Sequence, residues 1–260
     1  QTMPSINTPI LSSTTIRLPK ELSEQKKVAH FLRLLDERIA TQNKIIERLK
    51  TLIKGLNDLI HANIVGQITT FSQLGFAYSG LSGKNADDFG RGKPYITYLN
   101  VYQNPTIDEA RHEFVNISEN EKQNLVNYGD LLFTLSSETP EEVGIGSVYL
   151  GIEKELYLNS FCFGVHITAS DNVYSPYLTY LVSSILFRKF VYPLAQGSTR
   201  FNLQKSDFMK KPFVIPIKSE QHKIANALGA LTTKVQREEQ ILFHLQKQKA
   251  YLLRTMLIQT

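Results

Sequence analysis

Apolar side chains recur with an alternating spacing of four and three residues in two long stretches of the chain. In the first stretch only Gln42 is polar, and the set is Val28, Leu32, Leu35, Ile39, Gln42, Ile46, Leu49, Ile53, Leu56 and Ile60. In the second only Glu238 and Lys249 are polar, and the set is Ile224, Leu228, Leu231, Val235, Glu238, Leu242, Leu245, Lys249, Leu252 and Met256. This spacing is typical of a coiled-coil seam. It predicts long helices within residues 20–60 and 214–260, with Ser23 and Ser219 as their N-caps.

The two stretches are copies of one another, 196 residues apart. Ser23-Glu24-Gln25 recurs as Ser219-Glu220-Gln221, and the polar breaks fall at equivalent positions. An internal pair must be antiparallel, because the intervening residues join the end of one helix to the start of the other. The side chains expected to pair are Leu32, Leu35, Ile39, Ile46, Leu49, Leu228, Leu231, Val235, Leu242 and Leu245. The alternative is a coil that pairs with another chain.

Residues 61–213 predict a mixed α/β domain between the helices. Runs rich in β-branched and aromatic residues predict strands at 94–101, 131–135, 147–150 and 156–167. A short helix is expected after the capping box of Ser118 and Glu121, and a longer one from Ser175-Pro176 to Gly197. The fold class is therefore α+β: one mixed α/β domain plus two long helices that pair as an antiparallel coiled coil.

Three loops rich in glycine and hydroxyl groups lie within this domain, at residues 79–93, 136–146 and 196–202. Loops on a rigid scaffold commonly carry recognition. The net charge of the chain is +5, yet residues 61–213 hold 12 Lys and Arg against 15 Asp and Glu. Residues 188–211 reverse this balance, with six basic side chains and one acid. A nucleic-acid surface on this domain is therefore expected to be local.

The sequence contains none of the catalytic or metal-binding motifs sought. A methyltransferase tetrad fails because Thr106 follows Asn104-Pro105, and the six histidines lack metal-ligand spacing. The single cysteine, Cys162, excludes a disulfide framework and a cysteine zinc site. His166, in an alternating strand, is interpreted as structural. With no signal peptide or membrane span visible, a cytoplasmic location is expected, with no catalytic and no metal site in this chain.

Taken together, the chain resembles the specificity subunit of a Type I restriction-modification enzyme, in a form with a single target-recognition domain. The stretches that carry the resemblance are LPKELSEQKKVAHFLRLLDERIATQNK, GRGKPYITYLNV, YGDLLFTLSSETPEEVG, LNSFCFG, QGSTRFNLQKSDF and IPIKSEQHKIANAL. The resemblance implies that residues 61–213 are a target-recognition domain that reads one half of a bipartite double-stranded DNA site.

The same resemblance implies partners. The helices at 20–60 and 214–260 would dock methyltransferase (modification) subunits, and through them a restriction/translocase subunit. S-adenosylmethionine, ATP and Mg would belong to those partners, with no cofactor in this chain. Residues 4–19 resemble the end of a preceding recognition domain, so residues 1–19 are expected to be a remnant of such a domain or a linker. The chain then corresponds either to a truncated longer subunit or to a half-subunit, which would form a homodimer.

Candidate DNA contacts come from the three loops. They are Lys84, Arg91 and Lys93 in the first, Ser136, Ser137 and Glu138 in the second, and Gln196, Ser198, Thr199 and Arg200 in the third. Arg200 can fork to guanine O6 and N7, and a carboxylate can accept from cytosine N4. The structural alternative for Arg200 is an ion pair with a carboxylate of the acidic segment. Two other classes of function stay open, a coiled-coil interaction scaffold without DNA specificity and a nuclease that acts alone.

Overall fold

The computed structural model describes residues 8, 12 and 19–257, so the expected domain remnant at 1–19 lies almost wholly outside the described residues. The chain forms two compact units, one of residues 54–229 and one of the flanking segments. Among the helices described, none has both the length and the apolar character needed to cross a membrane.

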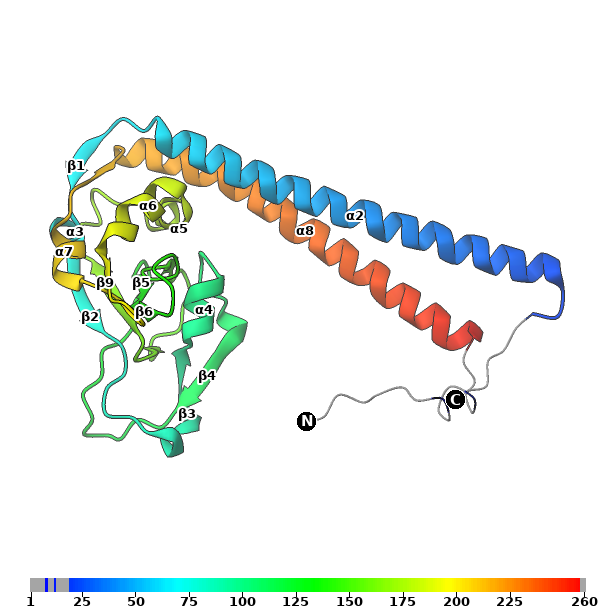
Figure 1. The fold of residues 1–260 in the computed structure, drawn as a ribbon, viewed down its shortest axis with the longest axis horizontal. Helices are drawn as coiled ribbons and strands as arrows, with labels where there is room; N and C mark the ends of the chain where they lie inside the picture. Colours follow the sequence, from blue (N-terminus) through cyan, green and yellow to red (C-terminus); the bar gives the residue numbers. More distant parts are fainter. Residues whose placement is uncertain (1–7, 9–11, 13–18, 258–260) are drawn as a thin grey trace. The chain divides into compact units, whose positions relative to one another are not determined.

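Two long helices, α2 (Leu22–Ala62) and α8 (Lys218–Leu257), account for the two seams. Each begins one residue before the serine expected to cap it, so Ser23 and Ser219 lie inside the first turn. In the unit formed by residues 1–53 and 230–260, the helices run side by side in opposite directions (Figure 1). Asp36 pairs with Lys249, whereas Lys50, further along α2, pairs with Glu239. The antiparallel internal pairing is therefore confirmed.

A polar layer interrupts the apolar seam near the middle of this pair. Gln42 Nε2 donates to the side-chain Oε2 of Glu238 at 2.5 Å and to its carbonyl oxygen at 3.1 Å. The same register aligns Leu35 with Leu245 and Ile46 with Val235, and all four side chains are buried. A buried polar pair in an apolar seam fixes the register of the helices, because a shift would leave the Gln42 amide without this partner while Glu238 keeps only Lys234 of its own helix.

The other unit, residues 54–229, is built on a four-stranded antiparallel sheet in the order β2-β9-β5-β7. Its strands are β2 (Gly75–Ser79), β5 (Leu131–Thr134), β7 (Gly146–Val148) and β9 (Cys162–Ile167). Every residue of β5 is buried, because apolar clusters cover both faces of the sheet. Leu131 and Phe133 face one cluster and Leu132 faces the other, which is the alternation expected of a strand.

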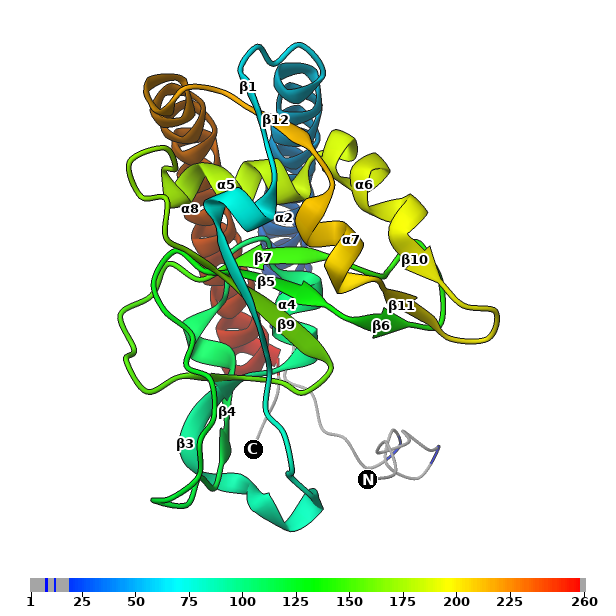
Figure 2. The same cartoon turned by 90° about the vertical axis from the view of Figure 1, so that its left-hand side faces the viewer.

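Four short helices contribute to the larger apolar cluster, together with Ala225 of α8: α3 (Phe71–Leu74), α5 (Ser175–Ser183), α6 (Ile185–Val191) and α7 (Lys205–Lys210) (Figure 2). Aromatic rings lie at its centre. Phe208 of α7 stacks on Phe71 with ring centroids 4.7 Å apart and meets Phe133 edge-on at 4.9 Å. Offset and edge-on arrangements of this kind add to the free energy gained from burial of the rings.

Three smaller sheets complete this unit. The strands β3 (Phe89–Ile96), β4 (His112–Val115) and β8 (Tyr157–Leu158) form one, and β1 (Gln67–Thr69) pairs with β12 (Phe213–Ile215). The third has the order β10-β11-β6, from β6 (Ser136–Ser137), β10 (Ala195–Gln196) and β11 (Phe201–Leu203). Short 3-10 turns occupy Ala86–Asp88, Glu109–Arg111 and Tyr192–Leu194.

Four expectations within this unit are corrected. The strand predicted at 94–101 ends at Ile96, and a helix, α4 (Tyr98–Gln103), follows because Thr97 Oγ1 accepts from the amide of Asn100 at 3.2 Å. The strand predicted at 156–167 is interrupted by a turn at residues 159–161. The helix predicted from Ser175 to Gly197 breaks at Ser184, whose Oγ caps α6, and α6 ends at Val191.

The fourth correction concerns the helix expected after Ser118. Glu121 Oε2 does accept from the amide of Ser118 at 3.2 Å, yet no helix forms. The same carboxylate also receives a hydrogen bond from Lys84 at 2.5 Å. The capping pair therefore closes a turn that is held by a lysine from a distant loop.

Candidate nucleic-acid interface

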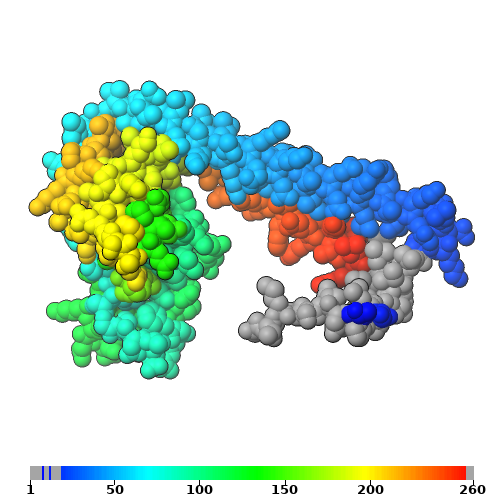
Figure 3. All heavy atoms as spheres, viewed as in Figure 1, coloured from blue at the N-terminus to red at the C-terminus, as the bar shows by residue number. Residues whose placement is uncertain are grey.

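The second and third loops meet at a cleft of about 430 Å³, here called the Arg200 cleft. Its lining comes from α4, the second loop, the turn between β8 and β9, and the third loop, as Tyr98, Leu99, Tyr102, Ser136, Ser137, Glu138, Glu142, Phe161 and Arg200. Pairing of β6 with β11, with Ser136 opposite Asn202, brings the two loops together. Figure 3 shows the surface near residue 200 in yellow against the green surface near residue 140.

The third loop is the tip of a hairpin formed by β10 and β11 (Figure 2). Gly197 has a φ of 150°, and a Cβ at this position would lie 2.0 Å from the carbonyl oxygen of Arg200. Only glycine allows the two ends of the tip to approach this closely. The side chains of Gln196, Ser198 and Thr199 are all exposed at the tip, where a bound molecule could reach them.

Neutral groups hold the Arg200 guanidinium. Its Nη2 donates to Ser136 Oγ at 3.3 Å, and its central carbon lies 5.5 Å from the centroid of the Phe161 ring. Within the described part of the chain, no ion pair joins Arg200 to a carboxylate. The guanidinium therefore keeps most of its N–H donors for a ligand, and the ion-pair alternative for Arg200 finds no support in the structure.

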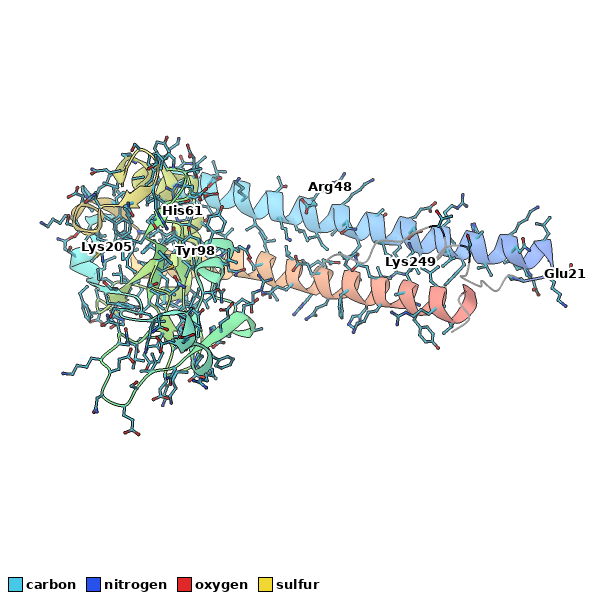
Figure 4. The ribbon with its side chains drawn as sticks, turned by 60° about the horizontal axis from the view of Figure 1, so that its bottom comes forward. Glu21, Arg48, His61, Tyr98, Lys205 and Lys249 are labelled. Carbon is cyan, nitrogen blue, oxygen red and sulfur yellow. The ribbon has the colours of Figure 1, made fainter. Side chains whose placement is uncertain are left out.

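Two carboxylates share the Arg200 cleft. Glu142 accepts hydrogen bonds from Tyr102 Oη at 2.7 Å and from Ser137 Oγ at 2.8 Å, and these bonds lower the pKa of the Glu142 carboxyl. Glu142 therefore joins the second loop to α4. Glu138 is exposed, and its carboxylate is an acceptor at the mouth of the cleft. Figure 4 labels Tyr98 of α4, whose hydroxyl donates to the carbonyl of Ser136 at 3.2 Å.

The first loop borders a second cleft, also of about 430 Å³, and Phe161 lines both clefts. Lys84 does not present its charge there. Its side chain is only 8% exposed, and Nζ donates to the carbonyl of Asn116 at 2.6 Å and to Glu121 at 2.5 Å. The hydrogen bonds that Glu121 accepts, first from Lys84 and then from Gln123, lower the pKa of its carboxyl to about 2. Lys84 therefore stabilises the loop, and its charge faces Glu121 instead of solvent.

The other two basic candidates of the first loop are at the surface. Arg91 is exposed, between two glycines of positive φ, Gly90 and Gly92. Lys93 is exposed and pairs with Glu155, also exposed. An exposed ion pair contributes little to stability, so Lys93 can exchange its partner for a phosphate.

The side chains predicted to pair the long helices differ in burial. Leu35, Ile46, Leu228, Val235 and Leu245 are buried. The half-buried members of the set are Leu32, Ile39, Leu49, Leu231 and Leu242. Figure 4 shows Lys249 reaching towards α2, where its Nζ lies 2.5 Å from Asp36 Oδ1.

Sequence reasoning missed the aromatic members of the Arg200 cleft. Tyr98 lies within the strand predicted at 94–101, Tyr102 follows that strand outside any predicted element, and Phe161 lies within the strand predicted at 156–167. The available signal was the Asn159-Ser160 pair, since both residue types favour turns. That pair interrupts the apolar run and turns the Phe161 ring out towards solvent.

The titratable groups of the core serve the fold. His166 Nδ1 lies 2.9 Å from Asp130 Oδ1, and Tyr78 Oη donates to the same carboxylate at 2.8 Å, which supports the structural interpretation of His166. Cys162 is buried, and burial raises the pKa of its thiol well above the usual value. Among the residues described, no group of three or more His, Cys, Asp or Glu side chains is placed to hold a metal ion.

A family model described as the Type I restriction modification DNA specificity domain matches residues 80–247. The chain belongs to this family. The matched region of the specificity domain contains the second and third loops, nearly all of the first, and much of α8.

Solved structures show the same fold. The HsdS subunit from Thermoanaerobacter tengcongensis matches with a TM-score of 0.57 and 14% identity, over 98% of this chain and 63% of that one. The S subunit of a Type I restriction-modification system from M. genitalium matches with a TM-score of 0.51 and 14% identity, over 92% and 62%. A chain from a study of type I R-M complex assembly and conformational transition matches with a TM-score of 0.57 and 15% identity, over 92% and 60%.

The specificity domain described here thus spans about 60% of the length of these solved chains. A search of curated proteins gave no match.

Proposed function

We propose that this chain is a sequence-specific DNA-recognition subunit of a Type I restriction-modification complex and that it reads one half of a bipartite target. The observation that carries the proposal is the state of Arg200. Its guanidinium lies at the cleft where two loops meet, and the groups that hold it are a serine hydroxyl and an aromatic ring. An arginine that forms no ion pair with a carboxylate of the described residues retains its fork of donors for a ligand.

The proposed reading occurs in the major groove. Arg200 would donate to O6 and N7 of a guanine, and Glu138 in the same cleft can accept from N4 of a cytosine. Ser198, Thr199, Arg91 and Lys93 are exposed and suit phosphate oxygens. Phosphate contacts set the position of the protein on the duplex, whereas the contacts made in the Arg200 cleft would select the sequence.

The proposed partners follow from the family. We assign methyltransferase subunits to the surface of the long helices, and a restriction/translocase subunit joins through them. S-adenosylmethionine, ATP and Mg would bind to those subunits, while this chain would supply no catalytic group. A homodimer of half-subunits, which would read both halves of a site, remains part of the same proposal.

The decisive experiment is selection of duplexes from a randomised library by the purified full chain, with Arg200→Ala in parallel. The wild-type chain should enrich a motif. The Arg200→Ala variant should lose about 1–3 kcal/mol of binding free energy on that motif, and it should discriminate less between base pairs at one position. DNA methylation mapped in cells that express the chain with its methyltransferase should show the same motif. A chain that shows no affinity for duplex DNA, and no dependence of binding on salt, would instead favour a coiled-coil interaction scaffold. Mg²⁺-dependent cleavage of DNA by the chain alone would favour a nuclease.

A further inference from the structure

Phe161 is an exposed aromatic side chain on a backbone that hydrogen bonds hold in place. Its amide donates to Asn159 Oδ1 at 2.9 Å, and its carbonyl accepts from the amide of Leu135 at 2.9 Å. The ring is nevertheless 53% exposed, in the turn between β8 and β9. This exposed ring at a fixed position lies beneath the Arg200 guanidinium, whose central carbon is 5.5 Å from the ring centroid.

The backbone links this ring to Arg200. The carbonyl of Leu135 accepts from the amide of Leu203 on β11 at 2.9 Å, while the amide of Leu135 donates to Phe161. Ser136, the next residue, supplies the hydroxyl that Arg200 contacts. The ring, the hydroxyl and the strand that follows Arg200 are therefore all attached to one short stretch, which fixes their relative positions.

The charge within the cleft limits what the guanidinium can contact. Glu138 and Glu142 line the same cleft as Arg200, and these carboxylates repel a phosphate group. A guanine edge is uncharged and offers two acceptors in the plane of the guanidinium fork. A guanidinium over an aromatic ring keeps the N–H donors along its edge available, because the ring occupies only one face.

We infer that Phe161 is a positioning residue that holds Arg200 for reading a guanine in the major groove. This inference rests on the proposed function and adds a specificity determinant outside the three loops. The ring limits the orientations of the Arg200 side chain before DNA binds, so the side chain loses less conformational entropy on binding. The contribution of Phe161 should therefore appear as discrimination between base pairs.

The test compares Phe161→Leu, which keeps apolar bulk, with Phe161→Tyr, which keeps the aromatic face. Each variant of the full chain is measured against the selected duplex and against duplexes with one base pair replaced, alone and combined with Arg200→Ala. Phe161→Leu should lower discrimination at the position read by Arg200 by about 3- to 30-fold, and Phe161→Tyr should restore it. In the Arg200→Ala background Phe161→Leu should have no further effect.

The salt dependence and thermal stability separate the outcomes. Because the inferred contact is to a base edge, Phe161→Leu should leave the salt slope and the melting temperature unchanged. An equal loss in both backgrounds would show that Phe161 touches DNA itself, and unchanged discrimination would show that the ring does not position Arg200. Either result would overturn the inference about Phe161 without contradicting the proposed function, because the wild-type chain would still select a DNA motif. A wild-type chain that selects no motif would instead refute the proposed function.

Discussion

The absence of a side chain beyond one hydrogen atom at Gly197 allows the β10–β11 hairpin to close. With φ at 150° and the carbonyl oxygen of Arg200 2.0 Å from the position of a Cβ, Gly197→Ala must move the tip of the hairpin. We expect this variant to lose discrimination between DNA sequences to the same extent as Arg200→Ala, with little change in melting temperature because the apolar core is untouched.

Gly83→Ala is the matched control. Gly83 also has a positive φ, 67°, but no atom of the described residues lies within 4 Å of where its Cβ would be. This control should carry backbone strain of about 1 kcal/mol without a collision. Equal DNA discrimination by Gly197→Ala and the wild-type chain would contradict the role assigned to the tip.

His61 connects stability to pH. Its Nδ1 lies 2.9 Å from the carbonyl of Asn57, and its ring stacks on Tyr177. Its Nε2 is buried with no hydrogen-bond partner among the residues that the structure describes, and burial lowers the pKa of His61 below 6.5. The unfolded chain then takes up a proton at a higher pH than the folded chain. The free energy of unfolding should therefore fall as pH drops below about 6.5.

His61→Phe tests this effect, since it keeps the stacked ring and removes the titration. Urea unfolding at a series of pH values should give a smaller acid dependence for the variant. A remainder is expected from His112, whose pKa burial also lowers. Identical pH profiles for the variant and the wild-type chain would show that His61 does not contribute.

At the scale of residues, the sequence shows which side chains have suitable chemistry better than it shows where those side chains lie. Arg200 and Ser136 were candidates because of their residue types, and the β6–β11 pairing brings them together. Lys84 was a candidate for the same reason, yet its partner Glu121 lies 37 residues away and could not be known without the fold. Phe161 was missed because exposure of an apolar side chain depends on the turn around it.

At the scale of elements, the local pattern predicted three boundaries of the long helices to within two residues. An N-cap at Ser23 and an end at residue 60 were expected for the first helix, and α2 runs from Leu22 to Ala62. An N-cap at Ser219 was expected for the second helix, and α8 begins at Lys218. The four-and-three spacing is a local property that tertiary contacts only reinforce. The helix α4 was predicted as a strand because Tyr98 and Val101 favour strands, and the cap from Thr97 outweighs that preference. Short elements are decided by such single contacts.

The apolar residues of the two seams should differ in their contribution to the free energy of unfolding, because they are buried to different extents. Leu228 is 1% exposed, so Leu228→Ala should cost about 2–5 kcal/mol of unfolding free energy. Leu32 is half-buried, and Leu32→Ala should cost clearly less, because less apolar surface returns to water. Denaturant unfolding of the two variants measures both values. A larger cost at Leu32 than at Leu228 would contradict this ranking.

At the scale of the whole molecule, the expected behaviour is recognition without turnover. The purified full chain should bind duplex DNA with an affinity that falls as salt rises. It should neither methylate nor cleave that DNA, nor hydrolyse ATP. Methylation should appear on addition of a methyltransferase subunit and S-adenosylmethionine, assayed by transfer of a labelled methyl group. Turnover that copurifies with this chain alone would overturn the assignment.

The polar pair at the centre of the helices has a geometric consequence. Gln42 and Glu238 occupy the same position in the two copies of the repeat, and they are also hydrogen-bonded to one another. Two copies of one sequence that run in opposite directions and meet at equivalent residues are related by an approximate two-fold rotation through that point. Ile45 and Ile241 are equivalent in the same way, and they are exposed to nearly the same extent, 39% and 41%. The pair of helices therefore presents these two isoleucines on outer surfaces that are related by the same rotation, so residues common to both copies of the repeat occur twice on one chain.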